Sequence, residues 1–323
     1  MAQVTTTAGS TLLTKVTDAV HQRVVGQKEA IEGLLVALLT GGHILLEGLP
    51  GLAKTLMVRT LAQSLHTDFR RIQFTPDLLP SDIVGTPVFD QRSSQFRVQK
   101  GPIFSNIVLA DEINRAPPKV QAALLEAMEE RQVTIAGETY PLGSPFMVLA
   151  TQNPVELHGT YPLAEAQLDR FALKLDIGYP TREEEKTIVR QVAAGGQGPI
   201  AAVASVEELA AAREEVAAVH LEDKVLDYIV ALSFATREPS TVGLGDLEDL
   251  IEFGTSPRAT IVLSRAAKAR AFLRGRDYVL PDDVKAMVPS VLCHRLKTTY
   301  EADARGIDSR EIVRRVLGAV PAP

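Results

Sequence analysis

The stretch that decides the fold class is Gly48-Leu49-Pro50-Gly51-Leu52-Ala53-Lys54-Thr55. The apolar run Ile44-Leu45-Leu46 precedes it, and a helical pattern follows it. A phosphate-binding loop requires this setting, because the loop N–H groups and the helix N-terminus together attract anions. In such a loop Lys54 can reach the β- and γ-phosphates of a nucleotide, and the Thr55 hydroxyl can ligate Mg²⁺. The alternative is an ordinary turn with a surface lysine.

One position departs from the general loop pattern, which has glycine immediately before the lysine. This sequence has Ala53 there. Alanine is tolerated if the residue has a helical φ, because only a left-handed φ penalises a Cβ. The substitution therefore weakens the motif without breaking it.

A second signal lies at the end of another apolar run, Ile107-Val108-Leu109-Ala110, which Asp111 and Glu112 follow. A carboxylate at the C-terminal end of a parallel strand faces the ligand crevice of an open α/β sheet. Asp111 is then placed to hold Mg²⁺, directly or through water, and Glu112 can polarise an attacking water as general base. The alternative is a solvated acidic loop.

The rest of the chain predicts an α/β domain followed by a helical one. Short apolar runs bounded by turn residues indicate further buried strands at residues 71–74, 107–110, 146–150 and 171–177. Helical spacing is found at residues 11–39, 117–131, 206–234 and 257–274. Strands that alternate with helices indicate a parallel sheet. After Tyr179-Pro180 the strand-like runs vanish, so we place the domains at 1–180 and 181–323.

Two insertions interrupt the α/β rhythm. Residues 90–100 indicate a hairpin with a Ser-Ser turn between Phe89 and Phe96, and residues 133–142 indicate another that turns near Ala136-Gly137. With their flanks the insertions span about 75–104 and 133–146. The first carries Arg92, Arg97 and Lys100 against Asp90, too few cations for a nucleic-acid track.

Composition narrows the function classes. A length of 323 residues suits about two domains. A net charge of −6 argues against a protein that acts mainly by binding nucleic-acid phosphates. The lone Cys293 cannot form an internal disulfide, and we interpret it as a small core residue. Residues 1–10 do not resemble a signal peptide, and no apolar run is long enough to span a membrane, so we expect a cytoplasmic protein. None of the six histidines pairs at metal-ligand spacing, and His158, near Asn153, is the one that we consider for a site role.

Several stretches together resemble the MoxR family of AAA+ ATPases. They are residues 48–55, 111–119, 124–132, 150–154, 159–163, 165–171 and 256–259. They cover most of the chain between Val25 and Ala259, and Ala53 is similar to the family's own variant. The resemblance implies an AAA+ P-loop core with a five-stranded parallel sheet, an all-α lid, and ATP and Mg²⁺ as cofactors.

The resemblance also assigns roles to individual residues. Asn153 resembles sensor 1, which orients the attacking water, although an Asn before Pro154 also suits a plain turn. Arg170 resembles an arginine finger, which completes the nucleotide site of a neighbouring subunit. The alternative for Arg170 is a surface salt bridge. Arg115 is a second candidate for the residue that acts on the neighbouring subunit. Arg258 resembles sensor 2, acting in its own subunit or in the neighbour's. Val25-Gly26 resembles the loop that packs around adenine, or is a plain helix start. The implied nucleotide contacts are Gly48, Pro50, Gly51, Leu52, Ala53, Lys54, Thr55 and Leu56.

These assignments favour Mg²⁺-dependent ATP hydrolysis by an oligomeric ring, for which the resemblance suggests six subunits. It also implies chaperone-like remodelling, assembly or activation of complexes, with partners that contain von Willebrand factor A domains. A nucleic-acid motor and a nucleotide-switched scaffold stay open as alternatives. A GTPase is disfavoured because no Asn-Lys-x-Asp motif occurs, and adjacent Asp111-Glu112 with Asn153 fits water activation better than a small-molecule kinase.

Overall fold

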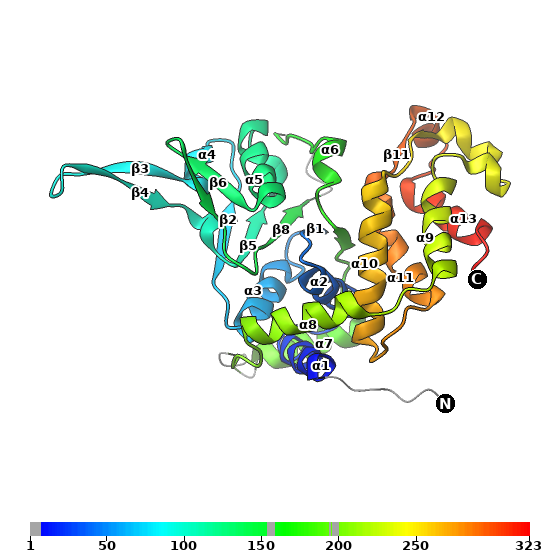
Figure 1. The fold of residues 1–323 in the computed structure, drawn as a ribbon, viewed down its shortest axis with the longest axis horizontal. Coiled ribbons are helices and arrows are strands. Elements are labelled where there is room, and N and C mark those ends of the chain that lie inside the picture. Colours follow the sequence, from blue (N-terminus) through cyan, green and yellow to red (C-terminus); the bar gives the residue numbers. More distant parts are fainter. Residues whose placement is uncertain (1–7, 154–158, 194, 196–199) are drawn as a thin grey trace.

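A five-stranded parallel sheet forms the centre of the N-terminal part in this computed structural model, which describes residues 8–153, 159–193, 195 and 200–323 (Figure 1). The strand order is β2-β5-β8-β1-β9. The strands are β1 (Ile44–Glu47), β2 (Phe69–Gln73), β5 (Ile107–Asp111), β8 (Met147–Gln152) and β9 (Leu173–Asp176). Each lies within three residues of a predicted strand, so the prediction of a five-stranded parallel sheet is confirmed.

Side chains alternate between two apolar clusters, one on each face of the sheet. Along β5, Ile107 and Leu109 pack with α1 (Ala8–His21), α2 (Lys28–Thr40) and α3 (Lys54–Ser64). Val108 and Ala110 pack with α4 (Pro80–Val84) and α5 (Pro118–Glu130) on the other face. Because both faces are covered, the inner strands β1, β5 and β8 are almost entirely buried, as parallel strands usually are, whereas the edge strand β2 keeps Arg70 and Arg71 exposed.

The N-terminal helical stretch is two helices instead of the continuous one that the sequence pattern suggested. Gly26 and Gln27 both have left-handed φ values, 73° and 54°, and this breaks the chain between α1 and α2. A similar break separates α8 (Val206–Ala218) from α9 (Asp223–Ala235), where the His220 N–H donates to the Asp277 carbonyl at 2.8 Å. In both places a local break divides a helical pattern that spacing alone makes continuous.

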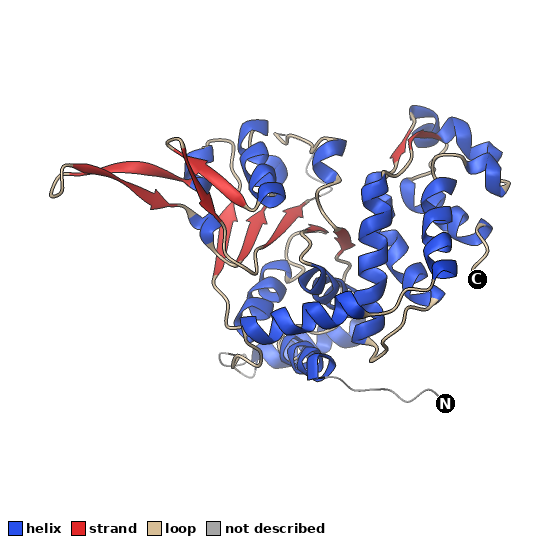
Figure 2. Cartoon of the chain, in the orientation of Figure 1, coloured by secondary structure: helices blue, strands red, loops and turns tan. Residues whose placement is uncertain are grey.

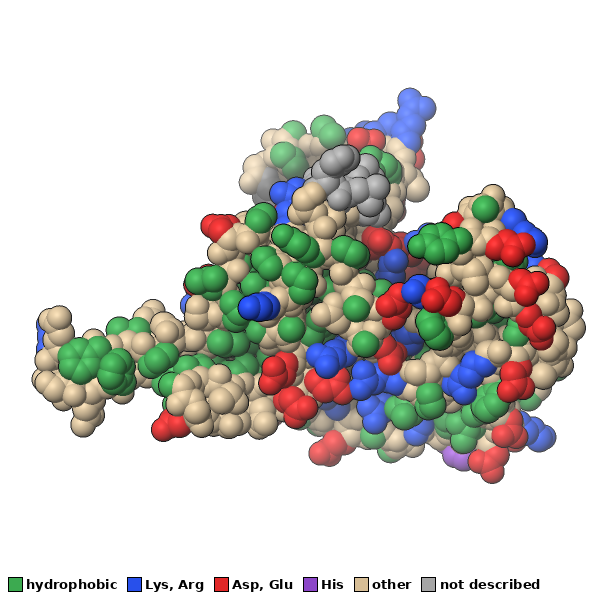
Figure 3. Space-filling model, turned by 90° about the horizontal axis from the view of Figure 1, so that it is seen from above, with side chains coloured by type: hydrophobic (Ala, Val, Ile, Leu, Met, Phe, Trp, Pro, Cys, Tyr) green, Lys and Arg blue, Asp and Glu red, His purple; other side chains and the backbone are tan. Residues whose placement is uncertain are grey.

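Both predicted hairpins are present. In β3 (Gly85–Asp90) and β4 (Gln95–Lys100), Phe89 lies opposite Phe96 with ring centroids 5.3 Å apart. This hairpin projects from the body, and hydrophobic side chains cover part of it (Figures 1 and 3). The second hairpin joins β6 (Gln132–Ile135) to β7 (Glu138–Pro141) through Ala136 and Gly137, which both have positive φ.

The C-terminal part is helical, as Figure 2 shows. Its helices are α7 (Arg182–Ala193), α8, α9, α10 (Pro257–Leu273), α11 (Pro281–Leu292), α12 (Tyr300–Ala304) and α13 (Ser309–Ala319). The one strand pair there is the short ribbon β10 (Ile251–Phe253) and β11 (Lys297–Thr298), among the residues described.

Short helices occur in both parts of the chain. The 3-10 helices lie at Pro102–Phe104, Ile113–Arg115, Pro239–Val242, Gly245–Leu250 and Cys293–Arg295, and the four-residue helix α6 is Glu165–Leu168.

The helical part does not stand apart from the sheet. One apolar cluster runs from β1 and α2 into α10 and α11 without a break. On α8, Arg213 donates through Nε and Nη2 to the Leu38 carbonyl at the end of α2, at 2.9 and 2.7 Å. The boundary at residue 180 stays a prediction. Within the described residues, no helix is long and apolar enough to cross a membrane.

Candidate active site

A cavity of about 400 Å³ opens at the carboxyl ends of β1, β5 and β8. The strand register puts these ends together, since Glu47 lies opposite Gln152 and Gln73 opposite Asp111. The cavity is lined by Pro50, Gly51, Leu52, Ala53, Lys54, Thr55, Leu56, Arg71, Asp111, Glu112, Thr151, Gln152 and Asn153. Most of the residues that the sequence singled out for nucleotide and metal therefore surround one space.

In the loop between β1 and α3, close packing restricts the residue type at one position, and another position has an unusual backbone conformation. A Cβ on Gly48 would lie 2.7 Å from the Ile177 carbonyl oxygen, so only glycine fits beside β9 there. Ala53 adopts φ 58° and ψ 18°, a left-handed conformation. The expectation that Ala53 would have a helical φ is therefore wrong: the residue directly before α3, which begins at Lys54, is left-handed.

The Lys54 ammonium folds back over its own loop. Nζ donates to the carbonyls of Gly48 and, at 3.1 Å, Leu49. Partial burial lowers the pKa of Lys54, and the nearby carboxylates of Asp111 and Glu112 oppose that shift. The ammonium is thus held at the mouth of the loop and faces two carboxylates.

Asp111 is the buried member of the carboxylate pair. Its Oδ1 accepts a 2.5 Å hydrogen bond from the Thr151 hydroxyl on β8. Its Oδ2 accepts from Nε and Nη2 of Arg71 on β2, at 2.9 and 2.6 Å. The carboxylate is therefore fixed between its two neighbouring strands.

Glu112 turns away from the strand direction. Its φ is 58°, and its N–H donates to the Thr151 hydroxyl at 2.8 Å. Its Oε2 accepts from Gln73 Nε2 at 2.8 Å and lies 3.1 Å from Arg115 Nε. A non-glycine residue in this conformation is uncommon and is concentrated at functional sites. Glu112 in this conformation is one of the residues that line the cavity.

Sequence reasoning missed Arg71, Gln73 and Thr151 as site residues. Arg71 and Gln73 sit two apart on β2, so their side chains share a face, and that strand ends beside β5. Polar residues at the end of a predicted parallel strand were the available signal, but the strand order was not known from the sequence. Asn153 directly follows β8 and lines the cavity, and its role as sensor 1 stays a prediction.

The oxygen atoms of the side chains that line the cavity fit a magnesium ion. Mg²⁺ prefers carboxylate and other oxygen ligands and keeps several waters. The Asp111 carboxylate and the Thr55 hydroxyl line the same space as Lys54. These are the two residues that the sequence predicted as metal ligands, and they would hold the ion.

Val25 and Gly26 do not line this cavity. The loop instead lies against the segment after β9: a Cβ on Gly26 would meet Glu184 Oε1 at 2.4 Å, and Gln27 Nε2 donates to the Gly178 carbonyl at 2.8 Å. An adenine contact at Val25-Gly26 stays a prediction.

Arg170 and Arg258 lie in a different cavity, of about 380 Å³, between α5, α10 and the segment after α6. We call this the arginine cleft; its charged lining residues are Arg131, Arg170, Arg258, Arg265, Arg295, Glu129 and Asp169. Arg258 Nη2 contacts Glu129 Oε1 at 2.6 Å, and Arg170 Nε lies 3.4 Å from Glu129 Oε2. The two cavities share no lining residue.

Comparison with known proteins agrees with this geometry. Residues 43–173 match the family "ATPase family associated with various cellular activities (AAA)", and residues 246–316 match "AAA lid domain". The chain is 48% identical to "Chaperone MoxR1" of Mycobacterium tuberculosis, across 94% of this chain and 80% of that protein. It is 30% identical to "Protein MoxR" of Methylorubrum extorquens, across 94% and 93%.

The chain belongs to the MoxR family of AAA+ ATPases. A crystal structure from Cytophaga hutchinsonii, of a candidate ATPase, superposes with a TM-score of 0.92 at 49% identity and covers 98% of this chain and 96% of that one. The α/β AAA+ core with a helical lid is therefore the fold of this MoxR-family chain, as the resemblance implied.

The histidine and cysteine side chains described in this MoxR-family chain give no sign of a second reactive site. No group of His, Cys, Asp and Glu in the described part of the chain could hold a metal ion by itself. His43 and His294 are buried, and burial lowers the pKa of His43 to about 4. Burial raises the pKa of the Cys293 thiol to about 11, which makes it a poor nucleophile. His158 lies outside the described residues.

Proposed function

We propose that this MoxR-family chain hydrolyses ATP with Mg²⁺, works as an oligomeric ring, and uses turnover to remodel, assemble or activate partner protein complexes. The observation that carries the proposal is the shared cavity at the sheet edge. In it the phosphate loop, the carboxylates of Asp111 and Glu112, and Asn153 face one space. A cation, a general base and a water-positioning amide in one cavity are the parts that phosphoryl transfer to water needs.

Each residue has a distinct role in this proposal. Lys54 neutralises charge on the β- and γ-phosphates, and backbone N–H groups of the loop bind phosphate oxygens. Glu112 accepts the proton of the attacking water, and Asn153 orients that water. Asp111 and Thr55 would hold Mg²⁺, which when bound neutralises developing phosphate charge.

Arg170 and Arg258 act on a neighbouring subunit's nucleotide in this proposal. Neither lines the cavity of its own phosphate loop, and both are partly exposed in the arginine cleft. An arginine supplied in trans contributes about 10³ to 10⁵ in rate, or roughly 4 to 7 kcal/mol. Turnover per chain should therefore rise steeply with protein concentration, and a flat specific activity across the dilution range would count against it.

A protein partner fits the projecting hairpin better than nucleic acid does. Phe89 and Phe96 are exposed by 50% and 72%, whereas Arg97 pairs with Asp90 at 3.3 Å and Lys100 lies over the Phe104 ring. An exposed aromatic pair favours apolar contacts with a protein. A partner with a von Willebrand factor A domain is what the family resemblance suggests.

The decisive experiment traps the partner. Glu112→Gln keeps the phosphate loop and removes the general base, so the variant should bind ATP and hydrolyse it at least about 100-fold more slowly. The tagged variant is held with ATP and Mg²⁺ in its native extract, and co-purifying molecules are identified. Lys54→Ala, which loses the phosphate contact, is the empty control.

The outcomes separate the three functions. A von Willebrand factor A protein retained only by Glu112→Gln supports remodelling. Nuclease-sensitive nucleic acid points to a motor. If no ATP-dependent partner appears and wild-type turnover is negligible, a nucleotide-switched scaffold explains the chain better.

A further inference from the structure

Glu129, near the C-terminal end of α5, joins the two arginines of the arginine cleft. Its two carboxylate oxygens bind different residues: Oε1 accepts from Arg258 Nη2 at 2.6 Å, and Oε2 lies 3.4 Å from Arg170 Nε. Arg258 belongs to the first turn of α10 in the lid, whereas Arg170 lies between α6 and β9 in the core. One carboxylate therefore sets the spacing of two cations that come from separate parts of the fold.

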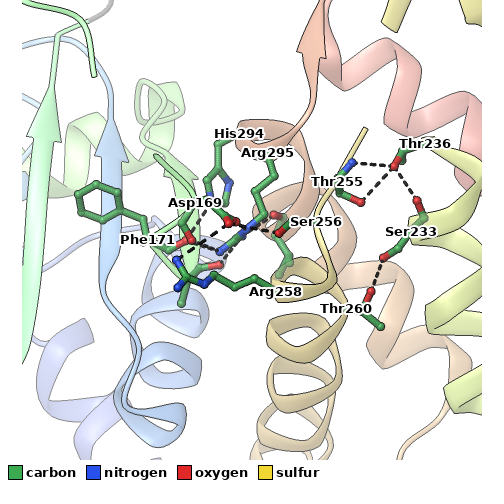
Figure 4. Close-up of polar contacts among 12 residues, drawn as sticks. Asp169, Phe171, Ser233, Thr236, Thr255, Ser256, Arg258, Thr260, His294 and Arg295 are labelled. Atoms are coloured by element: carbon green, nitrogen blue, oxygen red, sulfur yellow. Dashed lines mark hydrogen bonds and ion pairs between the residues drawn. The ribbon is translucent and has the colours of Figure 1, made fainter. Parts of the chain in front are cut away.

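The backbone around Arg170 is fixed independently of Glu129. Arg295, whose side chain is 1% exposed, donates Nη2 to the carbonyls of Asp169 and Phe171, at 3.1 and 2.6 Å. Its Nε also donates to the Asp169 carboxylate at 2.7 Å, which the Ser256 hydroxyl contacts as well (Figure 4). The Arg170 side chain is left with Glu129 as its ion-pair partner within the described chain. Its direction therefore depends on that carboxylate.

The arginine cleft carries more positive than negative charge. Its lining includes the guanidinium groups of Arg131, Arg170, Arg258, Arg265 and Arg295 and the carboxylates of Glu129 and Asp169. Guanidinium groups that line one cleft repel one another, and an anion bound among them would reduce that repulsion. A cleft with this excess suits a multiply charged anion such as a triphosphate. The chain's own phosphate loop lines a separate cavity.

We propose that Glu129 is a positioning residue that holds Arg170 and Arg258 ready for the γ-phosphate of a nucleotide bound by a neighbouring copy of this chain. The inference rests on the function proposed above, because it takes both arginines as trans-acting. Each guanidinium has five N–H donors and directs one at Glu129, and Arg258 Nη1 also lies 4.0 Å from Asp169 Oδ2, so donors remain on both for phosphate oxygens. Glu129 stays in contact with the arginines while they bind phosphate.

The test compares turnover and nucleotide binding in matched variants of the full chain. Glu129→Gln removes the charge that orients the arginines and should lower kcat by about 10- to 100-fold, the range expected from misplacing a reacting group by about 1 Å. The KM for ATP and the affinity for a fluorescent ATP analogue should change less than about 2-fold, because Glu129 lies outside the nucleotide cavity. Thermal unfolding checks that the fold is retained.

Glu130→Gln is the control, since Glu130 is the next residue of α5 and is exposed. It makes the same charge change and should leave kcat within about 2-fold. The effect of Glu129→Gln should disappear when both arginines are already alanine, because residues that act as a unit are not additive. A Glu129→Gln loss that persists in the Arg170→Ala/Arg258→Ala background would overturn the inference.

Failure of this inference can be told from failure of the proposed function. If Arg170→Ala abolishes turnover while Glu129→Gln matches the wild type, Glu129 has no positioning role and the trans arginine stands. If Glu129→Gln is faster than the wild type, the carboxylate competes with phosphate, and the inference is wrong. If Arg170→Ala and Arg258→Ala both retain full turnover, the trans assignment itself fails, and the role of Glu129 fails with it.

Discussion

Ala53 holds the last loop position before Lys54 in a left-handed conformation, φ 58° and ψ 18°. Such a backbone costs a residue with a Cβ about 1–2 kcal/mol, and glycine adopts it freely. The neighbouring loop residues and α3 hold Ala53 there despite this cost. The strain lies beside the phosphate-binding N-terminus of α3, where backbone direction decides which N–H groups face the cavity.

Ala53→Gly should therefore raise the free energy of unfolding by about 0.5–1 kcal/mol. The relieved strain exceeds the roughly 0.5–1 kcal/mol that glycine's greater freedom costs in the unfolded chain. Urea unfolding without nucleotide measures the change. Ala62→Gly, at a buried position inside α3, is the opposite control and should lose at least about 1 kcal/mol, because helix propensity and core packing are both reduced. A destabilised Ala53→Gly would contradict the strain argument.

The Arg71 guanidinium contacts the Asp111 carboxylate, which is proposed to hold Mg²⁺, so a change at Arg71 should alter metal binding. Arg71 is 49% exposed, so its pair with Asp111 contributes about 0.2–1 kcal/mol. Arg71→Ala should lower the Mg²⁺ concentration needed for half-maximal binding of a fluorescent ATP analogue, by about 2- to 5-fold. Arg70→Ala is the neighbouring control, since Arg70 is exposed and carries the same charge on the opposite face of β2. A higher Mg²⁺ requirement in Arg71→Ala would mean that the guanidinium helps to bind the metal–nucleotide complex.

Among the elements, β1 is joined to its surroundings by His43, which directly precedes it. His43 Nδ1 accepts from the Val148 N–H on β8 at 3.0 Å, which leaves Nε2 to donate to the Met128 carbonyl on α5 at 3.1 Å. Burial lowers the pKa of His43 to about 4; the hydrogen bond to Met128 opposes the shift, and the charge of Arg131 adds to it. The neutral ring ties two strands to one helix.

This pKa predicts a loss of stability in mild acid. The folded pKa, about 4, lies below the ordinary value of 6.5, so the unfolded chain binds more protons between these two values. The His43 contribution is complete above pH 6.5 and should fall by about 2 kcal/mol between pH 7 and pH 5. Urea unfolding at both pH values measures it. His43→Gln should lose about 2 kcal/mol less over the same interval, whereas exposed His66→Gln should keep the wild-type dependence; equal slopes in all three would refute the assignment.

Across the whole molecule, charged side chains join the lid to the core in addition to the shared apolar cluster. Arg270 on α10 bridges Glu32 on α2 and Asp283 on α11, both at 2.9 Å. The Asp283 side chain is fully buried and also accepts from Arg276 and from the Leu280 N–H. A buried carboxylate is tolerated only with such partners.

Asp283→Asn should lower the free energy of unfolding by about 3 kcal/mol, because it leaves two arginines without their buried partner. Asp282→Asn makes the same change on a side chain that is 85% exposed and should alter stability by less than about 0.5 kcal/mol. Urea unfolding of both variants at pH 7 measures the difference. Similar values for the two would show that the buried network around Asp283 contributes little to the stability of the protein.

The sequence by itself determined the elements and the chemistry that depends on short-range order. The run from Gly48 to Thr55 predicts its own loop and helix, and Asp111-Glu112 predicts the end of its own strand, because turn residues and apolar spacing act over a few positions. Both hairpins were predicted for the same reason. The continuous helices were wrong at Gly26-Gln27 and near His220, where a local break interrupts a regular pattern.

Only the tertiary structure decided which distant residues meet. Arg71 reaches Asp111 because β2 lies beside β5, and Glu129 reaches Arg258 because α10 packs near α5. Neither the strand order nor the helix packing can be predicted from the local spacing of apolar residues, since both depend on burying the apolar faces of the whole chain together. The left-handed Ala53 has the same origin, because the surrounding fold over-determines a conformation that alanine alone avoids.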